Sequence, residues 1–217
     1  QEKNPKHENT HTTYPKLWNT AKAVLKEKFI TLNTRAVKVE KSPLQLEIIA
    51  YFVRKYNTFA IVDEVYSHII YKPHTYTYFC ELPGMYERTV CIGSLSKTYS
   101  ITGWRVGYII GSPVIVEEIK KIHAYLTISA PSPLQEAAVT GLDFNQAYYD
   151  SLIEMYTKKR DIFMNGLDEL NITHNIPCGA FYILLDISEY GYEKYTEFCE
   201  TLVKKVGVGA VPGSVFF

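Results

Sequence analysis

Four short apolar segments, each closed by polar residues, lie in the first half of the chain. They are FITLNT at 29–34, FAIVDEV at 59–65, TVCIGSLS at 89–96 and RVGYIIGS at 105–112. Apolar runs of this length, rich in Ile and Val, are typical of strands buried on both faces of a sheet. The pattern therefore predicts four strands in a sheet that helices cover on both sides.

Segments with the periodicity of amphipathic helices alternate with these strands. We predict helices at 18–28, 42–57, 113–126 and 131–142. Ser42 and Pro43 suit the N-cap and the first turn of the second helix. Its buried face is expected to hold five apolar residues, Leu44, Ile48, Ile49, Phe52 and Val53. Strands that alternate with helices in this way predict an α/β fold with a mostly parallel sheet.

The pattern changes after about residue 142. A long charged helix is predicted at 146–170, followed by two short strands within 171–187, a helix at 192–206 and a last strand and turn at 207–214. This mixture predicts a smaller α+β domain at 143–217, joined to a larger domain at 17–142. Residues 1–16 are polar without periodicity, so we expect a tail or a surface loop there.

Composition and charge narrow the class of protein. The 217 residues are 47% hydrophobic and 21% charged, which is typical of a globular protein. The 23 Lys and Arg residues balance 23 Asp and Glu residues, which argues against a nucleic-acid partner. No apolar run approaches the roughly 20 residues of a membrane span. Four scattered cysteines indicate reduced thiols in a cytoplasmic protein, and the histidines lack the spacing of metal ligands.

Polar side chains that can take part in catalysis or ligand binding lie where the predicted strands begin or end. They are Asp63, Tyr66, Ser94, Ser96, Lys97 and Arg105. Because open α/β sheets bind ligands outside the carboxyl ends of their strands, we expect these side chains to share one rim. A lysine and an arginine beside hydroxyl groups indicate a phosphate, which Arg can hold through two parallel hydrogen bonds.

A nucleotide triphosphatase is one interpretation of such a phosphate site, but the sequence argues against it. The phosphate loop needs the pattern G-x-x-x-x-G-K-[ST]. In this chain Cys91 stands where the first glycine belongs and Ser96 where the second belongs. The lysine also follows the acidic strand, which reverses the usual order.

The run S-L-S-K-T-Y-S-I-T-G-W-R-V-G-Y at 94–108 closely resembles the lysine signature of class I/II aminotransferases, which are pyridoxal-phosphate enzymes of the aspartate aminotransferase type (fold type I). D-E-V-Y at 63–66 resembles the acidic strand end of that family. P-C-G-A-F-Y at 177–182 and V-P-G-S-V-F at 211–216 resemble its small-domain motifs. The resemblance extends from about Phe29 to Phe217. It implies the cofactor-binding large domain with an incomplete small C-terminal domain.

The resemblance also implies a role for each candidate residue. Lys97 is expected to form a Schiff base with pyridoxal 5'-phosphate and then to move the substrate proton. Asp63 is expected to pair with the pyridine nitrogen, so that the protonated ring accepts electrons. Tyr66 is expected to donate to the phenolate oxygen and to lower the pKa of the imine. The phosphate is expected to be held by Ser94, Ser96 and Arg105, and tight backbone turns are expected at Gly103 and Gly107.

The implied activity is transfer of an amino group between an L-amino acid and a 2-oxo acid, in a homodimer. Two alternatives stay open, namely β-elimination from cysteine conjugates on the same fold and a non-catalytic regulator or degenerate homologue that binds the cofactor. The asparagine of the family's N-P-x-G motif has no counterpart, because Arg35-Ala36-Val37 follows Thr34. Either this loop is shortened or residues are missing from the sequence there. The first half of the cofactor domain and the arginine for the substrate carboxylate are expected to lie outside this sequence.

Overall fold

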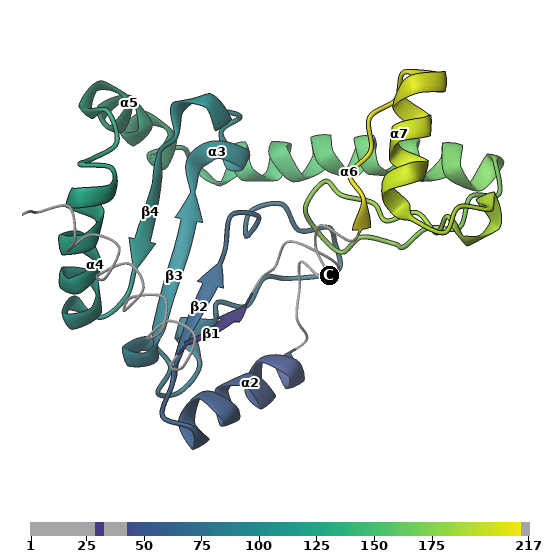
Figure 1. The fold of residues 1–217 in the computed structure, drawn as a ribbon. Coiled ribbons are helices and arrows are strands. Elements are labelled where there is room, and N and C mark those ends of the chain that lie inside the picture. The colour runs from purple at the N-terminus through teal and green to yellow at the C-terminus, as the bar shows by residue number, and fades with distance from the viewer. Residues whose placement is uncertain (1–28, 33–42, 214–217) are drawn as a thin grey trace, which may run out of the picture.

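The computed structural model describes residues 29–32 and 43–213 and contains a four-stranded sheet, from which the helices α6 (Gln146–Glu169) and α7 (Tyr195–Val206) extend to one side (Figure 1). The strands are β1 (Phe29–Leu32), β2 (Phe59–Asp63), β3 (Thr89–Ser94) and β4 (Gly107–Ile110). They lie in the order β1-β2-β3-β4, with β1, β2 and β3 parallel and β4 antiparallel to β3. The predicted α/β fold with a mostly parallel sheet is therefore confirmed.

Five of the described helices lie where the periodicity predicts helices, whereas a short helix at Leu95–Thr98 overlaps the end of the strand predicted at 89–96. They are α2 (Pro43–Lys55), α3 (Leu95–Thr98), α4 (Pro113–Leu126), α5 (Ser132–Leu142), α6 (Gln146–Glu169) and α7 (Tyr195–Val206). Single 3₁₀ turns occur at Phe79–Glu81, Tyr86–Arg88, Thr102–Trp104 and Ser188–Tyr190. In Figure 1, α6 runs from the region of the sheet to α7. The helix predicted at 18–28, the tail at 1–16 and the loop at 35–37 lie outside the described residues.

The buried face of α2 differs from the predicted one. Leu46, Ala50 and Val53 are the buried apolar residues of this helix, and they pack with Ala60 and Val62 of β2. By contrast, three of the residues expected to be buried are exposed, namely Leu44 (72%), Ile48 (49%) and Phe52 (39%). The helix is apolar on two sides at helical spacing, so periodicity alone could not decide which side the sheet covers.

The strands predicted after residue 170 are wrong. Across the described residues 171–213 no strand forms. The only β-type pairing there consists of isolated bridges between Ile70 and Gly179 and between His174 and Leu185. Pro177 lacks a backbone N–H, and Ala180 has a φ of 57°, so this segment cannot continue an extended ladder. Between α6 and α7 the chain instead forms irregular loops and the 3₁₀ turn at Ser188–Tyr190.

The predicted cover on both faces of the sheet does not reach β4. Within the described residues, Tyr108, Ile109 and Ile110 keep between 39% and 49% of their surface exposed. The backbones of β3 and β4 approach each other closely at Gly107, where an added Cβ would lie 2.7 Å from the carbonyl oxygen of Gly93. Glycine is therefore needed at 107. At Gly103 an added Cβ would meet nothing within 4 Å, so packing does not require a glycine at this position.

Candidate active site

The sheet places the candidate residues of β2 and β3 at one edge. Asp63 is the last residue of β2 and is in register with Ile92, two residues before Ser94 at the end of β3. Asp63 is half-buried, and its Oδ1 accepts a hydrogen bond of 3.3 Å from the backbone N–H of Val65. This bond fixes the turn that follows the strand, so the carboxylate lies at the carboxyl end of the sheet.

Ser94 directs the chain from β3 into the short helix α3. Its backbone is extended, and its Oγ accepts a hydrogen bond of 3.2 Å from the backbone N–H of Ser96, as an N-cap does. Ser96 is buried, and its carbonyl oxygen accepts a hydrogen bond of 3.2 Å from the Thr102 hydroxyl. These contacts fix the first turn of α3, in which the half-buried Lys97 follows Ser96.

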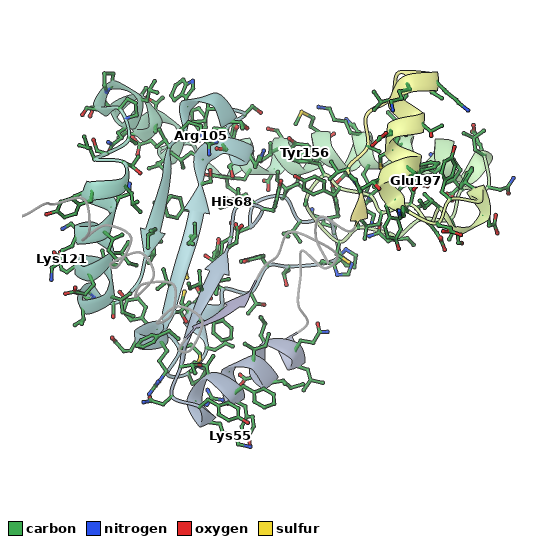
Figure 2. All side chains as sticks on the ribbon, in the orientation of Figure 1. Lys55, His68, Arg105, Lys121, Tyr156 and Glu197 are labelled. Carbon is green, nitrogen blue, oxygen red and sulfur yellow. The ribbon has the colours of Figure 1, made fainter. Side chains whose placement is uncertain are left out.

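Arg105 reaches the same edge because β4 runs antiparallel to β3, with Gly107 in register with Ser94. Its φ of 57° lies in the left-handed region, which costs a non-glycine residue about 1–2 kcal/mol. The Arg105 Nη1 donates to the Thr102 carbonyl oxygen at 3.2 Å, and the side chain is exposed. In Figure 2, Arg105 lies beside α3 and His68 lies beyond the end of β2, both away from Lys55.

A segment from the far end of the chain docks against the loop that follows β2. The backbone N–H of Tyr71 donates to the Cys178 carbonyl at 2.8 Å, and that of Ala180 donates to the Ile69 carbonyl at 2.8 Å. The Tyr71 hydroxyl donates to the Ala180 carbonyl at 2.5 Å, and Ala180 is fully buried. Residues more than 100 positions apart are thus fixed side by side.

This docking carries Phe181 and Tyr182 to two of the candidate residues. The Lys97 Nζ lies 5.5 Å from the ring centroid of Phe181, and the Tyr66 ring meets the same ring edge-on at 5.2 Å. The buried Tyr66 donates its hydroxyl proton to the Tyr182 Oη at 2.9 Å. The sequence predicts no role for Phe181 or Tyr182, although they belong to the motif at 177–182. Lys97 and Tyr66 therefore share a neighbour, whereas Arg105 is directed to Thr102.

A cleft of about 190 Å³ opens beside this aromatic group. Its walls come from α6 and from the docked segment, together with Tyr71, and are formed by Tyr71, Tyr156, Lys159, Arg160, Phe163, Pro177, Phe181, Tyr182 and Ile183. The Arg160 guanidinium lies 4.4 Å from the Tyr71 ring centroid and is ion-paired with Asp161 at 2.7 Å. Burial raises the pKa of the Tyr71 hydroxyl to about 12, so this group stays a hydrogen-bond donor at neutral pH.

Tyrosines of α6 hold α3 in place from the other side. The Tyr148 hydroxyl donates to the Thr98 carbonyl at 2.8 Å, directly after Lys97 in the chain. The hydroxyls of Tyr99 and Tyr149 lie 2.8 Å apart, and the His68 ring lies 4.9 Å from the Tyr149 ring. Burial raises the pKa of Tyr99 and lowers the pKa of His68, so both groups favour their neutral forms. The helix that carries Lys97 is thus anchored by neutral groups.

Glu64 is a buried carboxyl group next to Asp63 for which the sequence predicts no role. It is 5% exposed, and among the described residues its Oε1 has no hydrogen-bond partner. Burial raises its pKa from the usual 4.5 to about 7, against the lowering effect of a hydrogen bond with the Cys91 thiol. The folded protein therefore holds this carboxyl proton more tightly than the unfolded chain does.

We expect Glu64→Gln to stabilise the protein at pH 8 and to leave its stability unchanged near pH 4. The raised pKa means that the native state binds more protons than the unfolded state between about pH 4.5 and 7. Wild-type stability should therefore fall as pH rises through this window, whereas that of the variant should not. The gain at pH 8 should be about 1–3 kcal/mol, measured by urea unfolding at both pH values.

The exposed Glu193 supplies a matched control, because Glu193→Gln makes the same chemical change at the surface. It should leave the free energy of unfolding unchanged at both pH values. Equal destabilisation by Glu64→Gln at pH 4 and pH 8 would contradict a neutral, buried carboxyl group.

Two kinds of feature are absent from the part of the chain that the structure describes. No group of three or more His, Cys, Asp or Glu side chains in those residues is arranged to hold a metal ion. No helix among them is both long enough and apolar enough to cross a membrane.

Comparison with known families assigns residues 42–217 to the model described as aminotransferase class I and II. A methionine aminotransferase from Escherichia coli is 39% identical over 159 residues, which cover 73% of this chain and 41% of that protein. A kynurenine–oxoglutarate transaminase from Dictyostelium discoideum is 40% identical over 169 residues, which cover 75% of this chain and 39% of that protein.

Solved structures of aminotransferases share the fold. The N-succinyldiaminopimelate aminotransferase of Mycobacterium tuberculosis matches with a TM-score of 0.82 and 30% identity, over 87% of this chain and 49% of that one. The structure of an Escherichia coli protein identified as a methionine aminotransferase matches with a TM-score of 0.79 and 33% identity, over 92% of this chain and 53% of that one. The chain thus spans about half the length of the relatives that it matches.

Proposed function

Because the chain belongs to the class I and II aminotransferases, we propose that the protein moves an amino group from an amino acid to a 2-oxo acid, with pyridoxal 5'-phosphate bound at Lys97. The observation that carries this proposal is the gathering of Lys97 and Tyr66 around Phe181, at the edge of the sheet where Asp63 ends β2. An amine, a phenol and a carboxylate near one another are what this cofactor requires of its site.

The residues present fit the cofactor. When bound, pyridoxal phosphate supplies an electron sink for the negative charge that forms at the substrate Cα. In this proposal Asp63 accepts a hydrogen bond from the pyridine nitrogen and keeps it protonated. Ser94, Ser96 and Arg105 bind the phosphate, for which Arg105 exchanges the Thr102 carbonyl for phosphate oxygens.

Lys97 has two tasks in the proposed reaction. Its Nζ would hold the cofactor covalently before substrate binds. Once displaced, it would act as the general base that takes the proton from the substrate Cα and delivers it to the cofactor C4′, on the other side of the shared nitrogen. Tyr66 directs its hydroxyl proton to the cofactor's phenolate oxygen. The Phe181 ring beside the Lys97 amine restricts the space through which water can approach.

Several broader features belong to the same proposal. The division into a larger part at 17–142 and a smaller part at 143–217 is supported by α6, which leads away from the sheet (Figure 1). We also propose a homodimer and a cytoplasmic location. Methionine and kynurenine are the first donors to test, because two relatives are named for them and because Phe181 presents an apolar ring beside Lys97.

The test is product analysis of the full chain with pyridoxal phosphate, an amino-acid donor and a series of 2-oxo acids. Amino transfer should yield a new 2-oxo acid and a new amino acid in equal amounts. β-Elimination would instead release pyruvate and ammonia from a cysteine conjugate without an acceptor, and a regulator would bind the cofactor without turnover. Reduction with borohydride should attach the cofactor to the peptide that contains Lys97. Attachment to a different lysine would overturn the assignment.

A further inference from the structure

Two phenol groups from distant parts of the chain meet at the candidate site. The Tyr66 hydroxyl donates to the Tyr182 Oη at 2.9 Å, and the two rings lie 5.7 Å apart at 82°. Tyr66 is 3% exposed, whereas Tyr182 is 42% exposed and borders the cleft beside α6. The bond therefore joins a buried phenol to one at the edge of a cleft.

We propose that Tyr182 is a positioning residue that acts through Tyr66 and sets how strongly Tyr66 donates to the cofactor. This inference rests on the proposed function, because it assumes that Tyr66 faces the phenolate oxygen of pyridoxal phosphate. The proposal adds a residue that contacts Tyr66 rather than the cofactor.

The inference depends on the closeness of the two hydroxyl oxygens, which lie 2.9 Å apart. A phenol has one proton to donate, and in the structure Tyr66 gives it to Tyr182. When Tyr66 directs that proton to the cofactor instead, the Tyr182 hydroxyl, whose oxygen lies 2.9 Å from the Tyr66 oxygen, can turn and donate to Tyr66. Hydrogen bonds in such a chain polarise one another, so a proton donated by Tyr182 makes Tyr66 a stronger donor.

The position of Tyr182 is fixed well enough for this task. Two residues before it, Ala180 is fully buried and is held by hydrogen bonds to Ile69 and Tyr71. The Tyr182 ring also packs on Phe181, with centroids 5.0 Å apart. Because Tyr66 and Ala180 belong to one buried cluster, the backbone that carries Tyr182 is fixed relative to Tyr66.

The sign of the effect follows from the charge on the phenolate oxygen. A donor to that oxygen withdraws negative charge that would otherwise stabilise the neighbouring proton of the bound cofactor. A stronger Tyr66 donor therefore lowers the pKa at which the cofactor's visible chromophore loses its proton. Loss of the Tyr182 hydroxyl should raise that pKa.

The experiment is a spectroscopic pH titration of the full chain loaded with pyridoxal phosphate, without substrate. Tyr182→Phe keeps the ring and its packing and should raise the chromophore pKa by about half a unit. Tyr66→Phe should raise it further, by about one unit or more. The double variant Tyr66→Phe/Tyr182→Phe should match Tyr66→Phe alone, because in this proposal Tyr182 acts only through Tyr66.

Two further variants separate positioning from general structure. Tyr190→Phe removes an exposed phenol hydroxyl whose ring packs on Phe198, away from the site, and should leave the chromophore pKa unchanged. Tyr182→His keeps a ring and a hydrogen-bond donor and should recover at least half of the shift. Thermal melting should give a similar Tm for each variant. If Tyr182→Phe does not fold, the chromophore pKa of Tyr182→His is compared with that of a Tyr182→Leu variant instead.

The outcomes distinguish failure of this inference from failure of the proposed function. If Tyr66→Phe shifts the chromophore pKa and Tyr182→Phe does not, the role of Tyr182 is overturned and that of Tyr66 stands. If the double variant shifts further than Tyr66→Phe, Tyr182 acts by another route and the inference is equally overturned. If wild-type protein gives no visible band with the cofactor, the proposed function fails and the inference fails with it.

Discussion

Lys97→Ala is expected to reduce amino-group transfer by at least about 10³-fold, the scale lost when a positioned nucleophile and general base is removed. The alanine variant loses the amine that holds the cofactor and moves the substrate proton in the proposed reaction. It also loses the contact between the Lys97 Nζ and the Phe181 ring. Activity should be measured by the formation of the new amino acid, with cofactor content measured separately after gel filtration.

A second variant separates chemistry from charge. Lys97→Arg keeps a cation beside Phe181 but has no primary amine, so its activity should be as low as that of Lys97→Ala. Small primary amines added to the buffer should restore part of the activity to Lys97→Ala, where a space is left, and none to Lys97→Arg. More than a tenth of wild-type activity in either variant would exclude Lys97 as the base.

Asp63→Asn is expected to slow proton removal from the substrate by about 10²–10⁴-fold while leaving cofactor binding largely intact. The amide has nearly the same shape, and its oxygen can still accept the hydrogen bond that the backbone N–H of Val65 donates. What it lacks is the negative charge that keeps the pyridine nitrogen protonated. The rate should be followed as exchange of the substrate Cα hydrogen with deuterated water.

The adjacent carboxyl group provides the control for this variant. Glu64→Gln makes the same change from carboxyl to amide one residue along the chain, and its side chain faces Cys91 on the other side of the sheet. Exchange at Cα should stay close to the wild-type rate in that variant. An Asp63→Asn protein with nearly normal exchange would remove Asp63 from the mechanism.

The sequence predicts the sheet well because its strands are continuous apolar runs, which leave few alternatives. β2 and β3 form within the predicted segments 59–65 and 89–96, and each ends at a polar residue two positions earlier than predicted. The buried face of α2 could not be predicted in the same way. Ile48 and Phe52 are as apolar as Leu46 and Val53, and only the position of the sheet decides which pair is buried.

The candidate site was predictable where its residues follow strands, and unpredictable where distant segments dock. Asp63, Ser94 and Lys97 lie at one edge because parallel strands share a direction. The contact of Tyr66 with Tyr182 depends instead on hydrogen bonds between backbone groups at 69–71 and 178–180. Backbone bonds of this kind have no signature in residue type, and the left-handed φ of Ala180 is unusual for that residue.

The exposure of β4 has a consequence for handling this chain in solution. Among the described strands β4 is an edge, and all four of its residues are exposed. An edge strand with Tyr and Ile side chains and no charge presents a row of N–H and C=O groups that pair with no described strand, and this row can serve as a template for another chain. A preparation of these residues by themselves should therefore associate through edge-to-edge pairing as its concentration rises, and dilution should reverse the early stages of that association.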